Sequence, residues 1–246
     1  MPTLAAVFAH PDDETFAVGG VIAKYAESGA SCHLYSATDG DAGRSSGVVV
    51  SSREELAKLR RAELHKAASV LGISTVRMGG HPDGSLLQVD YDQLVGEIVD
   101  FLREHRPQVV LTFGPEGAPT GHRDHKAISR AATAAFFLSG LRTSLAVPQS
   151  GAAAHDEPFA PSRLYYVSWD PPPATAEFQT LAVPLTARVD IRTQLGVKRE
   201  AFLAHTTQRD HAKRFEELGL TNDECFALAA GVPQPAPITD DLFAGL

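Results

Sequence analysis

The stretch "TLAAVFAHPDDETFAVGG", residues 3–20, decides the fold. Its first seven residues, 3–9, form an apolar run typical of a buried strand, and residues 15–29 repeat apolar side chains at helical spacing up to a closing glycine. A buried strand that runs directly into a helix begins a β–α unit. Between the two lies "HPDDE" (10–14), which puts a histidine and three carboxylates at the mouth of the strand.

The same alternation continues through the first half of the chain. Glycine or Pro107 ends the helical patterns. Strands that alternate with helices of this length predict an α/β fold with a mostly parallel sheet and helices on both faces. In such sheets ligands bind beyond the carboxyl ends of the strands, so we expect the active site there. The further predicted strands are 31–38, 74–80 and 108–114, and the further predicted helices are 53–72, 91–106 and 125–140.

The second half of the chain is less regular. It contains a loop rich in proline, alanine and glycine, then extended segments, then helical patterns and a proline-rich end. Neither a repeat nor a clear domain boundary is present, so we expect residues 1–246 to form a single domain. The predicted segments are a loop at 147–162, strands at 163–169 and 179–191 around a turn at 170–178, and helices within 192–208 and around 211–219.

Composition and charge narrow the function classes. The chain has 246 residues and a formal net charge of −8, which argues against binding to nucleic acid because a phosphate backbone requires a basic face. The two cysteines, Cys32 and Cys225, form no CxxC motif and indicate no disulfide framework. The sequence has neither a signal-peptide pattern nor the run of about 18 apolar residues that a membrane span needs. We therefore expect a cytoplasmic protein without a membrane span.

Two polar clusters follow predicted strands and carry the candidate chemistry. The first holds His10, Asp12 and Asp13, and the second, "GHRDHKA" (121–127), follows the strand at 108–114. Each cluster alone fits a helix cap, since Asp is favoured at helix starts. Both fall on the same edge of the predicted sheet, however, where their histidines and carboxylates are the ligands that zinc prefers. The pair therefore favours a metal site over two unrelated caps.

The two motifs resemble the signature motifs of the PIG-L/LmbE-like family of metal-dependent N-acetylglucosaminyl deacetylases. "AHPDDETFAVGG" resembles the first and "GHRDHKA" the second. The resemblance extends over about residues 3–208 through "ATDGDAGRSSG", "LRRAELHKAASVLG", "HPDGSL" and "KREAFLAHTTQ". It implies a Rossmann-like fold, and the absence of G-x-G-x-x-G means that no dinucleotide is expected.

The resemblance also implies site residues. It assigns metal binding to His10, Asp13 and His125, and the role of general base to Asp12. His122 would stabilise the oxyanion in its protonated form, with the carboxylate of Asp124 holding its ring. The residues that it matches to substrate binding are Arg60, Asp83, His205 and Gln208.

The chain departs from the family pattern at two positions. Thr120 stands where some members have a tyrosine thought to polarise the substrate carbonyl, and the shorter threonine cannot reach as far. Arg123 stands where a proline is common.

The resemblance implies a small-molecule N-acetylglucosaminyl substrate, with a slight leaning toward mycothiol or bacillithiol biosynthesis. The expected reaction is hydrolysis of the acetamide by metal-activated water, with Zn²⁺ as the cofactor, although Fe²⁺ or another divalent metal suits the same ligands. The alternatives are a deacylase of another N-acyl sugar or of an antibiotic, and a catalytically silent sugar- or metal-binding protein. The sequence leaves open whether the protein forms a homo-oligomer.

Overall fold

One mixed sheet of seven strands forms the centre of the molecule in the computed structural model, which describes residues 1–142, 157–170 and 184–246. The strand order is β3-β2-β1-β4-β5-β7-β6. Pairing is parallel from β3 to β5, whereas β7 pairs antiparallel with both β5 and β6. The strands are β1 (Thr3–Phe8), β2 (Ser31–Thr38), β3 (Thr75–His81), β4 (Val109–Phe113), β5 (Arg163–Ser168), β6 (Ala187–Asp190) and β7 (Asp223–Gly231).

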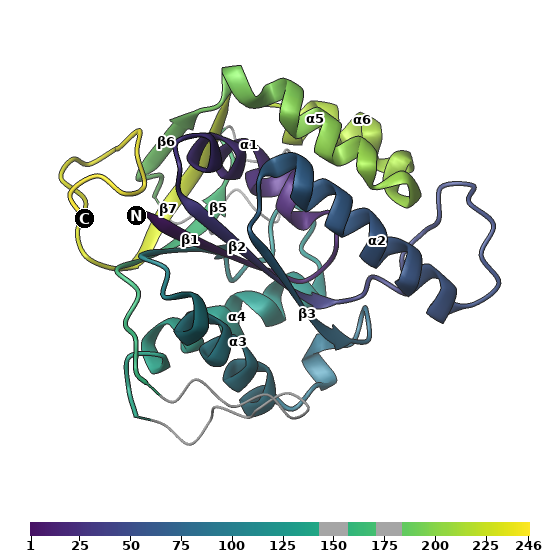
Figure 1. The fold of residues 1–246 in the computed structure, drawn as a ribbon, viewed down its shortest axis with the longest axis horizontal. Coiled ribbons are helices and arrows are strands. Elements are labelled where there is room, and N and C mark those ends of the chain that lie inside the picture. Colours follow the sequence, from purple (N-terminus) through teal and green to yellow (C-terminus); the bar gives the residue numbers. More distant parts are fainter. Residues whose placement is uncertain (143–156, 171–183) are drawn as a thin grey trace.

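Helices cover both faces of the sheet, as the alternation predicts (Figure 1). The helices α1, α2 and α5 pack together on one face, and α3 packs beside α4 on the other. Short helical turns join or follow these elements. The helices are α1 (Asp13–Glu27), α2 (Arg53–Leu71), α3 (Tyr91–His105), α4 (Arg123–Leu138), α5 (Leu195–Ala204) and α6 (Ala212–Arg214), and the turns are η1 (Leu86–Gln88), η2 (Arg192–Gln194), η3 (Thr206–His211) and η4 (Phe215–Gly219).

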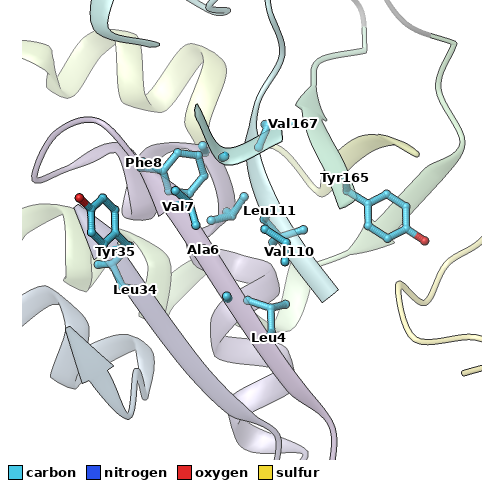
Figure 2. Close-up of a cluster of buried hydrophobic side chains, with 14 of the residues drawn as sticks. Leu4, Ala6, Val7, Phe8, Leu34, Tyr35, Val110, Leu111, Tyr165 and Val167 are labelled. Atoms are coloured by element: carbon cyan, nitrogen blue, oxygen red, sulfur yellow. The ribbon is translucent and has the colours of Figure 1, made fainter. Parts of the chain in front are cut away.

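The interior strand β1 is apolar on both faces because helices cover both. Figure 2 shows Val7 and Phe8 of β1 flanked by side chains of β2 and β4, among them Leu34 and Leu111. All four side chains are buried. A continuous apolar run is the usual signature of a parallel strand buried on two sides. The packing of this core fixes where β1 ends. It therefore also fixes the position of the polar residues that follow β1 at the edge of the sheet.

Helix ends follow their local sequence signals. Ser52 caps α2 by accepting a hydrogen bond from the backbone N–H of Glu55, and Gly72 ends the helix with φ of 76°. Both helices that follow the polar clusters begin two residues earlier than predicted, α1 at Asp13 and α4 at Arg123. The polar side chains therefore lie just before or within the first turn of each helix, next to the carboxyl ends of the strands.

The strand β7 is absent from the prediction, which gave the tail one helix and a proline-rich end. Its sequence "DECFALAAG" is rich in alanine, which has low strand propensity, and it does not alternate apolar with polar residues. Long-range pairing between β5 and β6 makes it a strand. The helix predicted around 211–219 is instead a succession of short turns, η3, α6 and η4.

Other predicted segments fall partly or wholly outside the described residues. These are the first part of the loop at 147–162, most of the turn at 170–178 and residues 179–183 of the predicted strand at 179–191. In the part of the chain that the structure describes, no helix is both long and apolar enough to cross a membrane.

Candidate active site

The candidate site lies where β1 and β4, neighbours at the centre of the sheet, end side by side. Strand order reverses between them, since β2 and β3 follow on one side and β5 on the other. This switch point is where open α/β sheets form a crevice for ligands. A cavity of about 260 Å³ occupies it. The lining residues are His10, Asp12, Asp13, Phe16, Arg60, Asp83, Phe113, Pro119, Thr120, His122, His125, Phe202, Gln208, His211 and Arg214.

Asp13 links the two motifs. Its Oδ2 accepts hydrogen bonds from the backbone N–H groups of His10 (2.8 Å) and Ala9 (3.2 Å). Its Oδ1 lies 3.3 Å from His125 Nε2, and its Oδ2 lies 3.5 Å from His10 Nδ1. Burial by itself would raise the pKa of Asp13, but the two histidines hold it well below its usual range. The carboxylate is therefore ionised between two imidazoles.

His10 is surrounded by carboxylates. Its Nε2 lies 3.0 Å from Asp83 Oδ1 and 3.4 Å from Asp124 Oδ2, yet this buried nitrogen has no partner with hydrogen-bond geometry. Burial alone would lower the pKa of His10, and the carboxylates of Asp124, Asp13 and Asp83 outweigh it and raise the pKa. Such a concentration of negative charge around a buried nitrogen suits a bound cation.

Candidate ligand atoms converge on His10. Its ring nitrogens lie within 4.8 Å of ligand atoms in two groups, one completed by His122 and His125 and the other by Asp83 and Asp124. Neither of these groups, found among the described residues, contains Asp13, although Asp13 contacts both His10 and His125 of the set expected from the sequence. The donor set of imidazole nitrogen and carboxylate oxygen fits zinc or another divalent transition metal.

Asp12 faces a different environment from its neighbour Asp13. Its backbone has φ of 112°, in the left-handed region that non-glycine residues rarely adopt. Its side chain lines the cavity, is 22% exposed, and has Oδ2 3.3 Å from Arg60 Nη2. Burial raises the pKa of Asp12, although Arg60 counteracts part of this shift. A carboxylate of raised pKa at the cavity wall can accept a proton.

His122 is the N-cap residue of α4 and also lines the cavity. Its Nδ1 accepts a hydrogen bond from the backbone N–H of Asp124 (3.2 Å). Burial lowers the pKa of His122, and the nearby His10 and His125 lower it further. We assign the neutral tautomer with its proton on Nε2, since Nδ1 is an acceptor. This differs from the protonated His122 expected from the sequence.

The expected contact between the Asp124 carboxylate and the ring of His122 is not formed. The carboxylate accepts the N–H groups of Gly84 (2.7 Å) and Leu86 (3.1 Å) instead. Asp124 is fully buried in the first turn of α4, where these two backbone donors occupy it. Burial would raise its pKa, but His10 and the two N–H groups lower it. Asp124 thus ties α4 to the loop after β3.

Two of the residues matched to substrate binding, Asp83 and Arg60, line the cavity. Both also contact neighbouring residues of the cavity wall. Asp83 follows β3 by two residues, contacts His10, and accepts the N–H of Ala42 (3.3 Å). The buried Arg60 guanidinium donates to the carbonyls of Pro11 and Gly40. Part of the hydrogen-bonding capacity of each side chain is therefore used within the protein.

The other two matched residues differ from each other. Gln208 lines the cavity, and its Nε2 donates to the carbonyl of Arg44 (3.0 Å). His205 does not line the cavity: its side chain is fully buried, with Nε2 2.7 Å from Glu14 Oε1, and its expected role in substrate binding stays a prediction. Burial alone would lower its pKa, but the Glu14 carboxylate outweighs this and raises it.

Several cavity residues were not found by sequence reasoning. Phe113 is the last residue of β4, and its ring stacks on His125 with centroids 4.1 Å apart. His211 and Arg214 belong to the short turns η3 and α6 and lie beyond the end of the motif "KREAFLAHTTQ", and Arg214 donates to the carbonyl of Pro119 (3.2 Å). Thr120, noted for its departure from the family, has its hydroxyl 3.4 Å from His125 Nδ1. The remaining lining residues missed are Phe16, Pro119 and Phe202.

Comparison with known proteins finds relatives that cover almost the whole chain. The protein family described as GlcNAc-PI de-N-acetylase (PIG-L) matches residues 5–136, which contain both polar clusters. A 1D-myo-inositol 2-acetamido-2-deoxy-alpha-D-glucopyranoside deacetylase from Rhodococcus jostii is 32% identical, over 99% of this chain and 98% of the relative.

Solved structures share the fold. The conserved protein TT1542 from Thermus thermophilus has a TM-score of 0.70 and 29% identity, over 95% of this chain and 97% of the other. A 4-carboxy-2-hydroxymuconate hydratase from Pseudomonas putida has a TM-score of 0.68 and 18% identity, over 96% of this chain and 99% of the other. The second likeness shows the fold alone, and because that protein is named for a different reaction, the fold does not select the chemistry.

Proposed function

Because this chain belongs to the GlcNAc-PI de-N-acetylase family, whose matched curated relatives are named as deacetylases, we propose that it hydrolyses the acetamide of an N-acetylglucosamine-containing small molecule. The products are acetate and a free amine. One observation carries the proposal: the loops after β1 and β4 bring a carboxylate between two histidines, and a second carboxylate, Asp12, into one cavity.

The donor set supports a divalent metal held by His10, Asp13 and His125. Asp13 touches both rings, and the buried His10 Nε2 lacks a hydrogen-bond partner while carboxylates surround it. Such a metal, Zn²⁺ or Fe²⁺, supplies Lewis acidity that lowers the pKa of water and polarises a carbonyl.

Asp12 acts as the general base. Its carboxylate reaches the cavity and is separate from the carboxylate of Asp13. It takes a proton from the attacking water and then returns it to the nitrogen of the leaving amine, so that one residue balances both proton transfers. The raised pKa of Asp12, caused by burial, favours the proton-holding state in between.

His122 stabilises the oxyanion. With Nδ1 accepting from the Asp124 backbone, its Nε2–H is the donor left for the cavity. A fixed donor aimed at the developing negative charge lowers the barrier even when the imidazole is neutral. The lowered pKa of His122 supports this neutral form.

The substrate is a single N-acetylated sugar with a small aglycone. The cavity of about 260 Å³ lies just below the usual range of ligand-site volumes, which favours one sugar residue in the site. The relative from Rhodococcus acts on an inositol glycoside, so N-acetylglucosaminyl inositol is our first candidate. Arg214 and His211, which line the cavity from the turns after α5, would face the aglycone.

A screen of three substrates tests the proposal. Protein reconstituted with Zn²⁺ or Fe²⁺ is incubated with N-acetylglucosaminyl inositol, N-acetylglucosaminyl malate and N,N′-diacetylchitobiose. We expect primary amine and acetate in equal amounts from at least one of them. Binding without product would favour a silent binding protein, and product only from another N-acyl sugar or an antibiotic would favour the alternative deacylase.

A further inference from the structure

Glu14 and His205 form a buried pair directly behind Asp12. Neither residue is exposed, and His205 Nε2 lies 2.7 Å from Glu14 Oε1. Neither lines the cavity. The two are 191 positions apart in the chain, so the fold rather than the local sequence brings them together.

Glu14 holds the backbone of Asp12. Its Oε2 accepts the backbone N–H of Asp12 (2.9 Å), while Oε1 accepts the hydroxyl of Thr15 (2.6 Å) and contacts His205. Asp12 has φ of 112°, a conformation that persists in a non-glycine residue only when its surroundings impose it. The Glu14 carboxylate is one of the contacts that impose it, and Arg60 is another, through the Pro11 carbonyl and Asp12 Oδ2.

His205 is itself fixed from the helix that carries Arg60. Glu63 of α2 accepts the backbone N–H of Thr207 (2.9 Å) and its hydroxyl (2.6 Å), two residues beyond His205. The turn η3 therefore cannot shift without breaking buried hydrogen bonds. This leaves His205 Nε2 as a fixed donor that orients the carboxylate of Glu14.

We propose that Glu14 and His205 are positioning residues for the reaction, which hold the backbone of Asp12 in its left-handed conformation and so aim its carboxylate into the cavity. The proposal rests on the proposed function in one respect, that Asp12 is the base. It predicts that loss of the pair lowers kcat while substrate affinity and metal binding persist, because neither residue touches the cavity.

The molecule offers a matched control in strand β7, whose Glu224 contacts the same helix, α1. Glu224 is also buried, pairs with Lys198 (2.6 Å), and accepts the N–H groups of Gly20 and Val21 in α1, each at 2.8 Å. The first of these contacts, at Gly20, is eight residues beyond Asp12, which corresponds to about 12 Å along a helix. Glu224→Gln therefore weakens the packing of α1 without removing a contact to the Asp12 backbone. It shows how much of any loss of kcat comes from destabilisation of α1 in general.

The test compares His205→Leu, which removes the donor at similar volume, with His205→Gln, whose amide nitrogen can reach the position of Nε2. For His205→Leu we expect kcat to fall by about 10- to 100-fold, with KM and bound metal within about twofold of wild type. His205→Gln should restore most of kcat, and Glu224→Gln should lower the melting temperature but keep kcat. If His205→Leu does not fold, His205→Asn, whose amide is one bond too short, takes its place.

A second measurement does not need turnover. Hydrogen exchange of the Asp12 backbone amide, followed by NMR, should speed up by about tenfold or more in His205→Leu and not in Glu224→Gln. Unchanged exchange, unchanged kcat in His205→Leu, or an equal loss of kcat in Glu224→Gln overturns the proposal. A wild-type protein that deacetylates none of the substrates overturns the proposed function alone, because the exchange experiment still decides whether the pair holds Asp12.

Discussion

At the scale of single residues, the neighbouring carboxylates of Asp12 and Asp13 have different surroundings because the backbone turns sharply between them. Asp12 adopts a left-handed conformation as the residue before α1, and Asp13 adopts the first helical one. Two imidazoles stabilise the charge of Asp13, whereas burial raises the pKa of Asp12. The geometry thus separates a candidate ligand from a candidate base within two consecutive residues.

We expect Asp12→Asn to lower kcat by about 10²- to 10⁴-fold, because an amide cannot take the proton from water. Metal content, measured by elemental analysis, should stay at the wild-type level. Asp13→Asn is the control, for which both metal and activity should be lost. Wild-type turnover in Asp12→Asn would remove Asp12 from the role of base.

The ion pair of His205 and Glu14 predicts a pH dependence of stability. The pKa of His205 is raised above 6.5 in the folded protein by Glu14, against the effect of burial. A raised folded pKa gives stability that is fully present below the unfolded value of about 6.5 and is lost as pH rises through the folded pKa. In urea titrations, the stability advantage of wild type over His205→Leu should therefore shrink as the pH rises above about 6.5. An advantage that grows with pH would contradict the assignment.

At the scale of elements, the loop between β2 and α2 is shaped around Arg60. Gly40 has φ of 66°, and a Cβ there would lie 2.2 Å from Arg60 Nη1, so neither the backbone nor the space accepts a side chain. The Arg60 guanidinium in turn donates to the carbonyl of Gly40 and contacts Asp12. The loop thus supports the turn after β1 through one buried side chain from α2.

Gly40→Ala should displace Arg60 and lower both kcat and stability. The control is Gly47→Ala in the same loop, which has φ of 79° but no atom within 4 Å of an added Cβ. This control should cost only the left-handed strain, about 1–2 kcal/mol, and leave kcat unchanged. Urea unfolding and steady-state kinetics measure the two effects. Equal kinetics in the two variants would show that Arg60 does not support the site.

At the scale of the whole molecule, the site joins segments from the ends of β1, β3 and β4 with the turns after α5. A metal bound by His10, Asp13 and His125 would cross-link the first and second motifs. Because a ligand that binds only the folded state stabilises it, metal at about 100 times its Kd adds about 2.7 kcal/mol. The single-domain organisation of residues 1–246 stays a prediction.

Chelation should therefore lower the melting temperature by about 5–10 °C, and added Zn²⁺ should restore it. His125→Ala, which removes one candidate ligand, should show little of this metal-dependent shift in calorimetry. His211→Ala changes a residue that lines the same cavity outside the proposed ligand set, and it should keep the shift. A full shift in His125→Ala would exclude His125 from the ligand set.

The parallel half of the fold was predictable because its elements are encoded locally. The apolar run of β1, the capped helix α2 and the glycine at its end each carry their own signal, and the resulting strands lie within about one residue of the predictions. The strand β7 was not predictable, since its alanine-rich sequence becomes a strand only by pairing with the remote β5 and β6. The part of the cavity wall formed by His211 and Arg214 was not predictable either, since only the tertiary structure brings these short turns to the site.

The sequence by itself determined the α/β class, the family, and the two loops whose histidines and carboxylates meet at the edge of the sheet. These follow from periodicity and motif, which are properties of neighbouring residues. Only the tertiary structure decided what each polar side chain touches: Asp124 holds the loop after β3, and His205 pairs with Glu14. A buried polar group must find a partner, and which partner is within reach depends on contacts between segments far apart in the chain.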